Sequence, residues 1–101
     1  MPIEPSSNPE VVLVSGEIDL SNLGDMVVAL DRAISHSRYV TVHLENVTFM
    51  GLEGARALMR AAESLPDGGR LYAIGPSQAI MRTMDILEAS RLRKLVLLPE
   101  C

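Results

Sequence analysis

The sequence predicts an α/β fold in which a mixed, mostly parallel sheet of four or five strands carries three or more helices. Aliphatic runs of strand length alternate along the chain with stretches whose apolar residues recur every three or four positions. Strands that are joined by helices need crossover connections, so the alternation favours a sheet that is largely parallel. A chain of 101 residues suffices for one domain with one core.

The first half of the chain predicts a strand and a helix. Val11–Val14 is a β-branched and aliphatic run that Gly16 ends, as expected of a strand covered on both faces. Ser21 or Asn22 can cap the following helix by accepting hydrogen bonds from its first N–H groups. That helix ends near His36, and its apolar stripe is Leu23, Met26, Val27, Leu30 and Ile34.

The middle of the chain predicts a second strand and a second helix. Tyr39–Leu44 alternates between apolar and polar residues, as in a strand. The segment Asn46–Leu58 leads from this strand through a short loop into a helix, and turn residues at 66–69 end that helix. The apolar stripe of the second helix is Ala55, Leu58, Met59, Ala62 and Leu65.

The last third predicts a strand, a helix and a final strand. Arg70–Ile74 is a strand that ends at Gly75, and Pro76 and Ser77 open a helix. Ile80, Met84 and Leu87 recur along that helix at helical spacing. Leu95–Leu98 is a short strand before a proline.

Composition limits the classes of function. Residues 1–10 hold three prolines and predict a flexible N-terminal arm, so the domain is expected over residues 11–101. A net charge of −4 argues against nucleic-acid binding, and no apolar run approaches the ~20 residues that membrane insertion needs. The N-terminus lacks the basic and apolar regions of a secretory signal, so a cytoplasmic location is expected. Cys101, the single cysteine, makes no disulfide within the chain.

Few residues suggest catalysis. Structural roles explain His36 and His43 best, and no catalytic residue, metal site or cofactor is expected. Asp19 and Glu53 should lie at turns on the same edge of the sheet, because parallel strands end on one side. Gly51 and Gly54 could let backbone N–H groups approach an anion, but the carboxylate of Glu53 would repel it.

Four segments, in order and at suitable spacing, resemble the STAS domain of bacterial anti-sigma factor antagonists. They are Gly16–Asp19 (GEID), Val47–Gly54 (VTFMGLEG), Gly68–Ser77 (GGRLYAIGPS) and Met81–Leu92 (MRTMDILEASRL). The resemblance covers roughly Val11 to Leu95. It implies a STAS-like domain that is not an enzyme and that binds a regulatory protein in the cytosol, typically an anti-sigma factor with serine kinase activity.

The chain departs from the family pattern at its regulatory motif. Family members carry Asp-Ser-Ser/Thr-Gly at the start of the second helix, and phosphorylation of the first Ser ends the complex. Here Gly51 stands in place of the Asp, Leu52 in place of the phospho-acceptor Ser and Glu53 in place of the second Ser or Thr, while Gly54 is kept. Leu52 cannot accept phosphate, so the resemblance implies a non-phosphorylatable antagonist.

Three hypotheses follow. The first is a transcription regulator that binds an anti-sigma factor, with Glu53 either mimicking permanent phosphorylation or pairing with a basic residue of the partner. The second is a scaffold subunit of a lipid transporter or signalling assembly, and the third is a sensor of nucleotides or small ligands. The sequence does not decide whether the chain forms a homodimer. The expected partner-binding residues are Asp19, Ser21, Gly51, Leu52, Glu53, Gly54 and Ser77.

Overall fold

The computed structural model describes residues 3–4 and 10–99 and contains one five-stranded sheet in the order β1-β2-β3-β4-β5. Strands β2 (Val11–Ile18), β3 (Tyr39–Met50), β4 (Arg70–Ile74) and β5 (Leu95–Leu98) are parallel to one another. The edge strand β1 (Ile3–Glu4) is antiparallel to β2. The prediction of a mixed, mostly parallel sheet is therefore confirmed.

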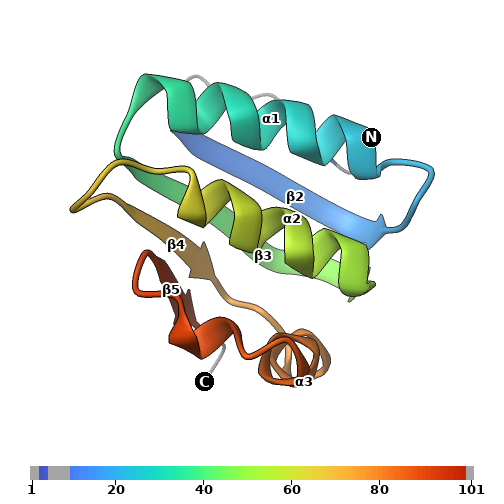
Figure 1. The fold of residues 1–101 in the computed structure, drawn as a ribbon. Coiled ribbons are helices and arrows are strands. Elements are labelled where there is room, and N and C mark those ends of the chain that lie inside the picture. The colour runs from blue at the N-terminus through green and yellow to red at the C-terminus, as the bar shows by residue number, and fades with distance from the viewer. Residues whose placement is uncertain (1–2, 5–9, 100–101) are drawn as a thin grey trace.

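The helices make a second layer on one face of this sheet. Figure 1 shows α1 (Leu23–His36) and α2 (Leu52–Glu63) lying side by side across the sheet. Helix α3 (Gln78–Ile86) follows β4 and leads into a short 3₁₀ helix, η1 (Ala89–Arg91). The order is that of an α/β domain with three α-helices, as the sequence predicts.

One aliphatic core fills the space between the two layers. Every second residue of the strands points into it, so the side chains of neighbouring strands form continuous rows. The core contains no polar or charged side chain among the described residues. Full burial of each larger side chain contributes about 1.5–3 kcal/mol. The strands supply Val12, Val14, Ile18, Val40, Val42, Leu44, Val47, Met50, Leu71, Ala73 and Leu95, and the helices supply Met26, Leu30, Ala33, Ala55, Leu58, Ala62, Ile80 and Met84.

Strands β2 and β3 extend further than the sequence predicts. Gly16 lies inside β2 with a φ of 73° and does not end it. The pairing of the two strands shifts twice, between Leu13 and Ser15 and between Gly16 and Glu17. Each shift accommodates one extra residue of β3, which breaks the alternation of exposed and buried positions after Leu44. Because β3 continues to Met50, the expected loop before α2 consists of Gly51 alone.

Strand β1 falls within the segment that the sequence predicts to be a flexible arm. Ile3 pairs with Val14, and Glu4 pairs with Leu13. A two-residue strand gives no periodic signal, so the sequence pattern does not reveal it. The rest of the expected arm, residues 1–2 and 5–9, lies outside the described residues.

The helix caps match the predicted positions but differ in one mechanism. Asn22 is the N-cap of α1, yet its side chain makes no capping hydrogen bond to the helix. Its Oδ1 instead accepts from the Asp19 N–H at 3.0 Å, and its Nδ2 donates to the Glu17 carbonyl at 2.8 Å. The predicted position of the α1 cap is therefore correct, but the predicted hydrogen bond from the first N–H groups of the helix to the capping side chain is wrong. Ser77 caps α3 as expected, with its Oγ accepting from the Ile80 N–H at 3.3 Å.

Candidate functional site

The turn between β2 and α1 meets the start of α2 at one edge of the sheet. Ile18 and Met50, the last residues of β2 and β3, pair with each other. The Gly51 N–H then donates to the Ile18 carbonyl at 3.4 Å, which holds the two connections together. The sequence predicts a common edge for Asp19 and Glu53, and both line one shallow pocket there.

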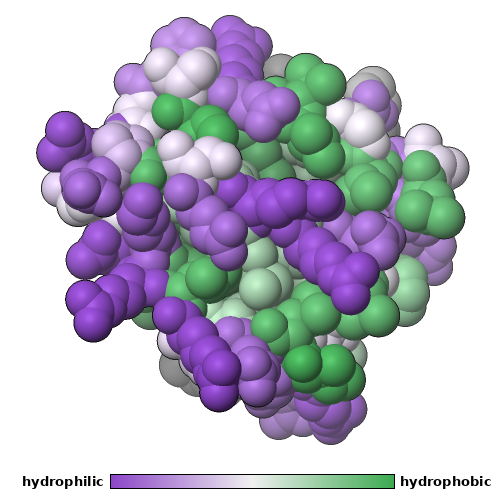
Figure 2. All heavy atoms as spheres, viewed as in Figure 1, coloured by the Kyte–Doolittle hydropathy of each residue, from purple (hydrophilic) through white to green (hydrophobic). Residues whose placement is uncertain are grey.

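The pocket measures about 250 Å³ and is bordered by exposed apolar side chains. We call Leu20, Phe49 and Leu52 the junction patch; their exposed fractions are 78%, 54% and 45%. Figure 2 shows apolar side chains toward the right of the view, where Figure 1 places the turn between β2 and α1 and the start of α2. Such large exposed hydrophobic side chains gathered at one place are typical of an interaction site. The whole lining comprises Ile18, Asp19, Leu20, Phe49, Gly51, Leu52, Glu53 and Gly54.

Two carboxylates flank the junction patch. Asp19 Oδ1 accepts from the Ser21 hydroxyl at 2.6 Å and from the Ser21 N–H at 2.9 Å. These two hydrogen bonds, the hydroxyl first, hold the pKa of Asp19 below its ordinary value. Glu53 pairs with Arg56 of the same helix, with 3.3 Å between Oε1 and the arginine nitrogen, and both side chains are about half exposed. The patch is therefore apolar with an acidic border.

The two glycines at the junction have different roles. Gly54 is buried, and a Cβ atom on it would lie 2.8 Å from Met50 Cγ and 3.3 Å from Ile18 Cγ2. Gly54 thus permits the first turn of α2 to lie directly on the ends of β2 and β3, and it is one of the residues that line the pocket. Gly51 is the N-cap of α2 and has room for a side chain. A Cβ atom on Gly51 would have the Phe49 ring as its nearest neighbour, at 3.8 Å.

The structure brings most of the predicted binding residues together. Gly51, Leu52 and Gly54 line the pocket with the two carboxylates, and Ser21 lies beside it through its bonds to Asp19. Ser77 is not part of the lining and instead caps α3. Leu20 and Phe49 are missing from the predicted set. Leu20 could have been found as an apolar residue in a turn, and Phe49 as the single phenylalanine of the chain.

The two histidines of the chain lie away from the pocket. His36 Nδ1 lies 2.8 Å from the Arg32 carbonyl oxygen, His43 Nδ1 lies 2.8 Å from Glu45 Oε1, and neither histidine lines the pocket. Over residues 3–4 and 10–99, no three His, Cys, Asp or Glu side chains gather in a way that could hold a metal ion. In the same part of the chain, none of the helices has the length and apolar character needed to span a membrane. The junction patch and its acidic border suit binding to a partner surface that has an apolar centre and a basic border.

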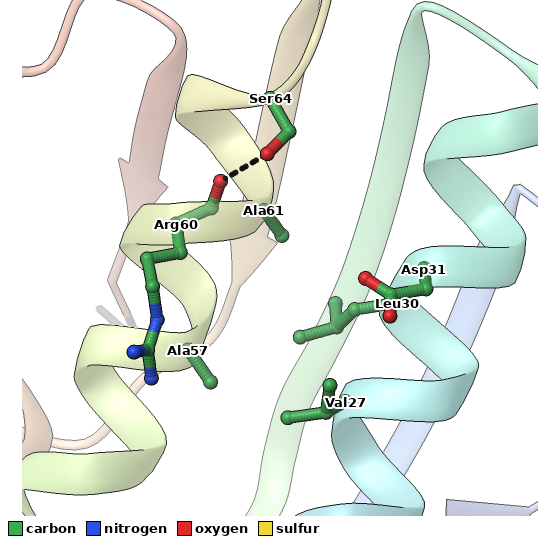
Figure 3. A pocket seen from close by; sticks show the side chains of 7 residues that line it. All are labelled: Val27, Leu30, Asp31, Ala57, Arg60, Ala61 and Ser64. Atoms are coloured by element: carbon green, nitrogen blue, oxygen red, sulfur yellow. Dashed lines mark hydrogen bonds between the residues drawn. The ribbon is translucent and has the colours of Figure 1, made fainter.

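A second, smaller pocket lies between α1 and α2. Figure 3 shows Val27 and Leu30 of α1 pointing toward the small side chains Ala57 and Ala61 of α2. The pocket measures about 190 Å³, and the charged residues on its border, Asp31 and Arg60, come from opposite helices. Small residues that face larger ones between two packed helices explain this space without a ligand.

Comparisons with known proteins agree with this architecture. Residues 3–98 match a family model described as "Mlab, STAS domain". The chain is similar to the crystal structure of an anti-sigma factor antagonist from Mycobacterium paratuberculosis, with 26% identity, a TM-score of 0.72 and coverage of 93% of this chain and 81% of the other. The search of curated proteins finds no match to this chain.

Two further solved structures share the fold at lower identity. The anti-sigma factor antagonist SpoIIAA in its unphosphorylated form has 19% identity and a TM-score of 0.67, covering 97% of this chain and 87% of the other. A proposed anti-sigma factor antagonist from Thermotoga maritima has 14% identity and a TM-score of 0.71, covering 94% and 84%. At these identities the likeness extends to the fold alone.

Proposed function

Because the chain belongs to the STAS domain family, we propose that it is a non-enzymatic module that regulates transcription by binding an anti-sigma factor. The single observation that carries this proposal is the junction patch, an apolar surface beside the β2–α1 turn and the first turn of α2. Its three side chains are exposed, while the residues beneath them are packed into the core. Aromatic and aliphatic side chains at the centre of an interface dominate its binding energy.

The proposal includes a partner site without a phosphorylation switch. Leu52 is the first residue of α2. By the resemblance to the family motif, we infer that it replaces the phospho-acceptor serine. Its side chain has no hydroxyl group, so no kinase can add phosphate there. Leu52 instead adds apolar contact area, and its half-exposed position allows a partner to reach it. We propose that the complex with the partner is constitutive.

A pull-down with variants of the junction patch tests the proposal. The tagged chain is incubated with cytosolic extract of its source organism, with and without ATP, and retained proteins are identified by mass spectrometry. We expect an anti-sigma factor to be retained equally in both conditions. Phe49→Ala and Leu52→Ala should each weaken binding of the purified partner by about tenfold or more, the usual effect at an interface centre.

Val28→Ala is the matched control. Val28 is an exposed apolar residue of α1 that does not line the pocket, so its truncation removes similar surface elsewhere. Equal loss of binding for Val28→Ala would contradict the assignment of the site. Release of the partner by ATP would contradict a constitutive complex and would point to a modified residue elsewhere, such as Thr48 or Ser77.

The second candidate function is a scaffold subunit of a lipid transporter or signalling assembly. Leu52 suits this function as well as the first, because a permanent contact within an assembly needs no phospho-acceptor. In this case the same patch would hold a transporter ATPase or another assembly subunit. The pull-down distinguishes the two functions by the identity of the retained protein.

A further inference from the structure

The second face of the sheet is not covered by any helix of the described residues. The buried residues of α1, α2, α3 and η1 all join the single core on the other face. We call the uncovered side the open face. Its centre consists of two rows of paired residues. Each row contains one residue from each of the four parallel strands. The rows are Val11, Thr41, Tyr72 and Val96, and Leu13, His43, Ile74 and Leu98.

The composition of the open face is unusual for a surface in contact with water. Six of the eight row residues are aliphatic or aromatic, and the exposed Tyr39 extends the apolar surface beyond the rows. Parallel sheets are nearly always covered on both faces, whereas antiparallel sheets commonly leave a polar face to solvent. A parallel sheet with an apolar second face therefore requires something to cover it.

We propose that the open face is the interface of a homodimer in which two copies pack face to face. The charges at the two ends of the face support a second copy as the occupant. Arg70 lies at the start of the strands, level with Tyr39, and Glu17 lies near the end of β2. Glu45 lies in β3 just beyond the row of His43, and its Oε1 is 2.8 Å from His43 Nδ1. One end of the face therefore carries Arg70, which also donates to the Gly69 carbonyl at 2.7 Å, and the other carries Glu17 and Glu45, with the apolar rows between them.

A two-fold axis that runs across the strands, between the two sheets, makes these charges complementary. It reverses the strand direction of one copy relative to the other, so the basic end of each face lies over the acidic end of its partner. The same axis places β4 over β4 of the second copy. Glu45 lies against Gly75, the residue that follows β4, because its side chain occupies the space where a Cβ atom of residue 75 would lie. Arg70 of one copy then lies near Glu45 of the other.

The size of the face determines the strength to expect. Four strands spaced about 4.8 Å apart, with about five residues each at ~3.3 Å per residue, span roughly 300 Å². Stable interfaces bury about 800 Å² of accessible surface per partner. The accessible area of the open face exceeds its flat area because side chains protrude from it, but it still lies at the lower end of the range for stable interfaces. The dimer should therefore dissociate on dilution in the micromolar range.

Sedimentation velocity of the whole chain tests the proposal. The chain is measured from about 5 to 500 µM, with Cys101→Ser as background so that no disulfide can join two copies. We expect a concentration-dependent change from one copy to two. Tyr72→Glu, at the centre of the face, should raise the dimer dissociation constant at least tenfold, and Val28→Glu on exposed α1 should leave it unchanged. A monomer at every concentration, or a dimer insensitive to Tyr72→Glu, would overturn the proposal.

Charge reversal tests the arrangement of the two copies. Arg70→Glu and Glu45→Arg should each raise the dissociation constant about tenfold, because each places like charges at both ends of the interface. The double variant should return it to within a few-fold of the parent, as expected for residues that contact each other. Thermal unfolding of each variant verifies that the fold is kept. Failure of the double variant to recover, with the fold intact, would overturn the proposed axis.

Discussion

Gly54, in the first turn of α2, lies so close to Met50, the last residue of β3, that a Cβ atom would come within 2.8 Å of Met50 Cγ. Met50 is itself buried, so its side chain cannot simply turn into solvent. The missing side chain therefore sets the distance between α2 and the sheet, and with it the shape of the pocket beneath the junction patch.

Gly54→Ala should destabilise the fold by about 1–2 kcal/mol. Overpacking of a core costs typically 1–3 kcal/mol, and the better helix propensity of alanine recovers at most about 1 kcal/mol. Urea denaturation measures the free energy of unfolding. Gly24→Ala is the control, because Gly24 lies in the first turn of α1 and a Cβ atom there would have no neighbour within 4 Å, so this substitution should be neutral or stabilising. Equal effects of the two substitutions would contradict the packing argument.

The strands that the sequence predicts well are those with an unbroken pattern. Arg70–Ile74 and Leu95–Leu98 match their predicted bounds, since each is a short run between turn residues. The second half of β3 escapes prediction because the two extra residues opposite β2 break its alternation. Gly16 resembles an end of β2 because a sequence does not distinguish a glycine within an irregular strand from one in a turn.

Removing the Ser21 hydroxyl should raise the pKa of Asp19. The hydroxyl bond is the largest cause of the lowered pKa, and the Ser21 N–H maintains part of the effect. Ser21→Ala should therefore move the pKa back toward its ordinary value of 3.8, as measured by NMR titration of the carboxyl carbon. Ser35→Ala is the control, because the Ser35 hydroxyl bonds to the Arg32 carbonyl and to no carboxylate. An unchanged pKa in Ser21→Ala would contradict the assigned cause.

The direction of this shift fixes a pH dependence. A carboxyl group whose pKa is lower in the folded state stabilises the fold above its unfolded pKa, near 4, where both states are ionised. This contribution decreases as the pH falls through the folded pKa, because the proton then breaks the bonds to Ser21. Asp19→Asn should thus flatten the stability profile below about pH 4 and leave its slope at neutral pH unchanged, as followed by urea denaturation at each pH. A changed slope near neutral pH would contradict this assignment.

Glu88→Gly should stabilise the fold by about 0.5–1 kcal/mol. Glu88 follows the C-cap of α3 and has a φ of 57°, the one positive φ of a residue other than glycine in the described part of the chain. A side chain in this left-handed conformation costs roughly 1–2 kcal/mol, partly offset by the greater freedom of an unfolded glycine. Thermal or urea unfolding measures the gain.

Glu88→Ala separates this strain from the side-chain contact. Glu88 pairs with Arg91 at 3.3 Å, and because both side chains are exposed the pair contributes little. Glu88→Ala removes the pair but keeps the strain, so it should change stability by less than about 0.5 kcal/mol. A gain in Glu88→Ala equal to that in Glu88→Gly would show that the left-handed conformation is not the cause.

The candidate site is only partly predictable from sequence. The common edge for Asp19 and Glu53 follows from parallel topology, since the ends of neighbouring parallel strands meet. The packing role of Gly54 depends on its distance from Met50, and the separation of Ser77 from the pocket depends on where α3 begins. Such distances between segments far apart in sequence carry no local signal.

Nucleotides should not stabilise the chain. The pocket of the junction patch presents the carboxylates of Asp19 and Glu53, which repel phosphate groups, and no arginine or lysine lines it. A thermal-shift series with ATP, ADP and GTP at millimolar concentration should therefore leave the melting temperature unchanged. A concentration-dependent rise that Leu52→Asp abolishes would favour the nucleotide-sensor hypothesis instead.

Glu53 and Arg56 should have opposite effects on partner binding. Glu53 already contacts Arg56, so its negative charge is partly compensated within the chain and resembles a phosphate group less than an isolated carboxylate would. We expect Glu53 to attract a basic residue of the partner. Glu53→Gln should then weaken binding about three- to tenfold, and Arg56→Gln should strengthen it, because the carboxylate no longer has a competing cation. Titration calorimetry at two salt concentrations measures both, with the difference shrinking at high salt.

Glu53→Ser distinguishes this explanation from phosphate mimicry. If Glu53 imitates a phosphorylated residue that repels the partner, replacing it by a small neutral side chain should tighten binding, and Arg56→Gln should weaken binding by exposing the charge. If Glu53 pairs with the partner, both signs are reversed. The two substitutions change the same charge pair in opposite directions and leave the apolar patch intact, so a common sign for both would contradict either electrostatic role.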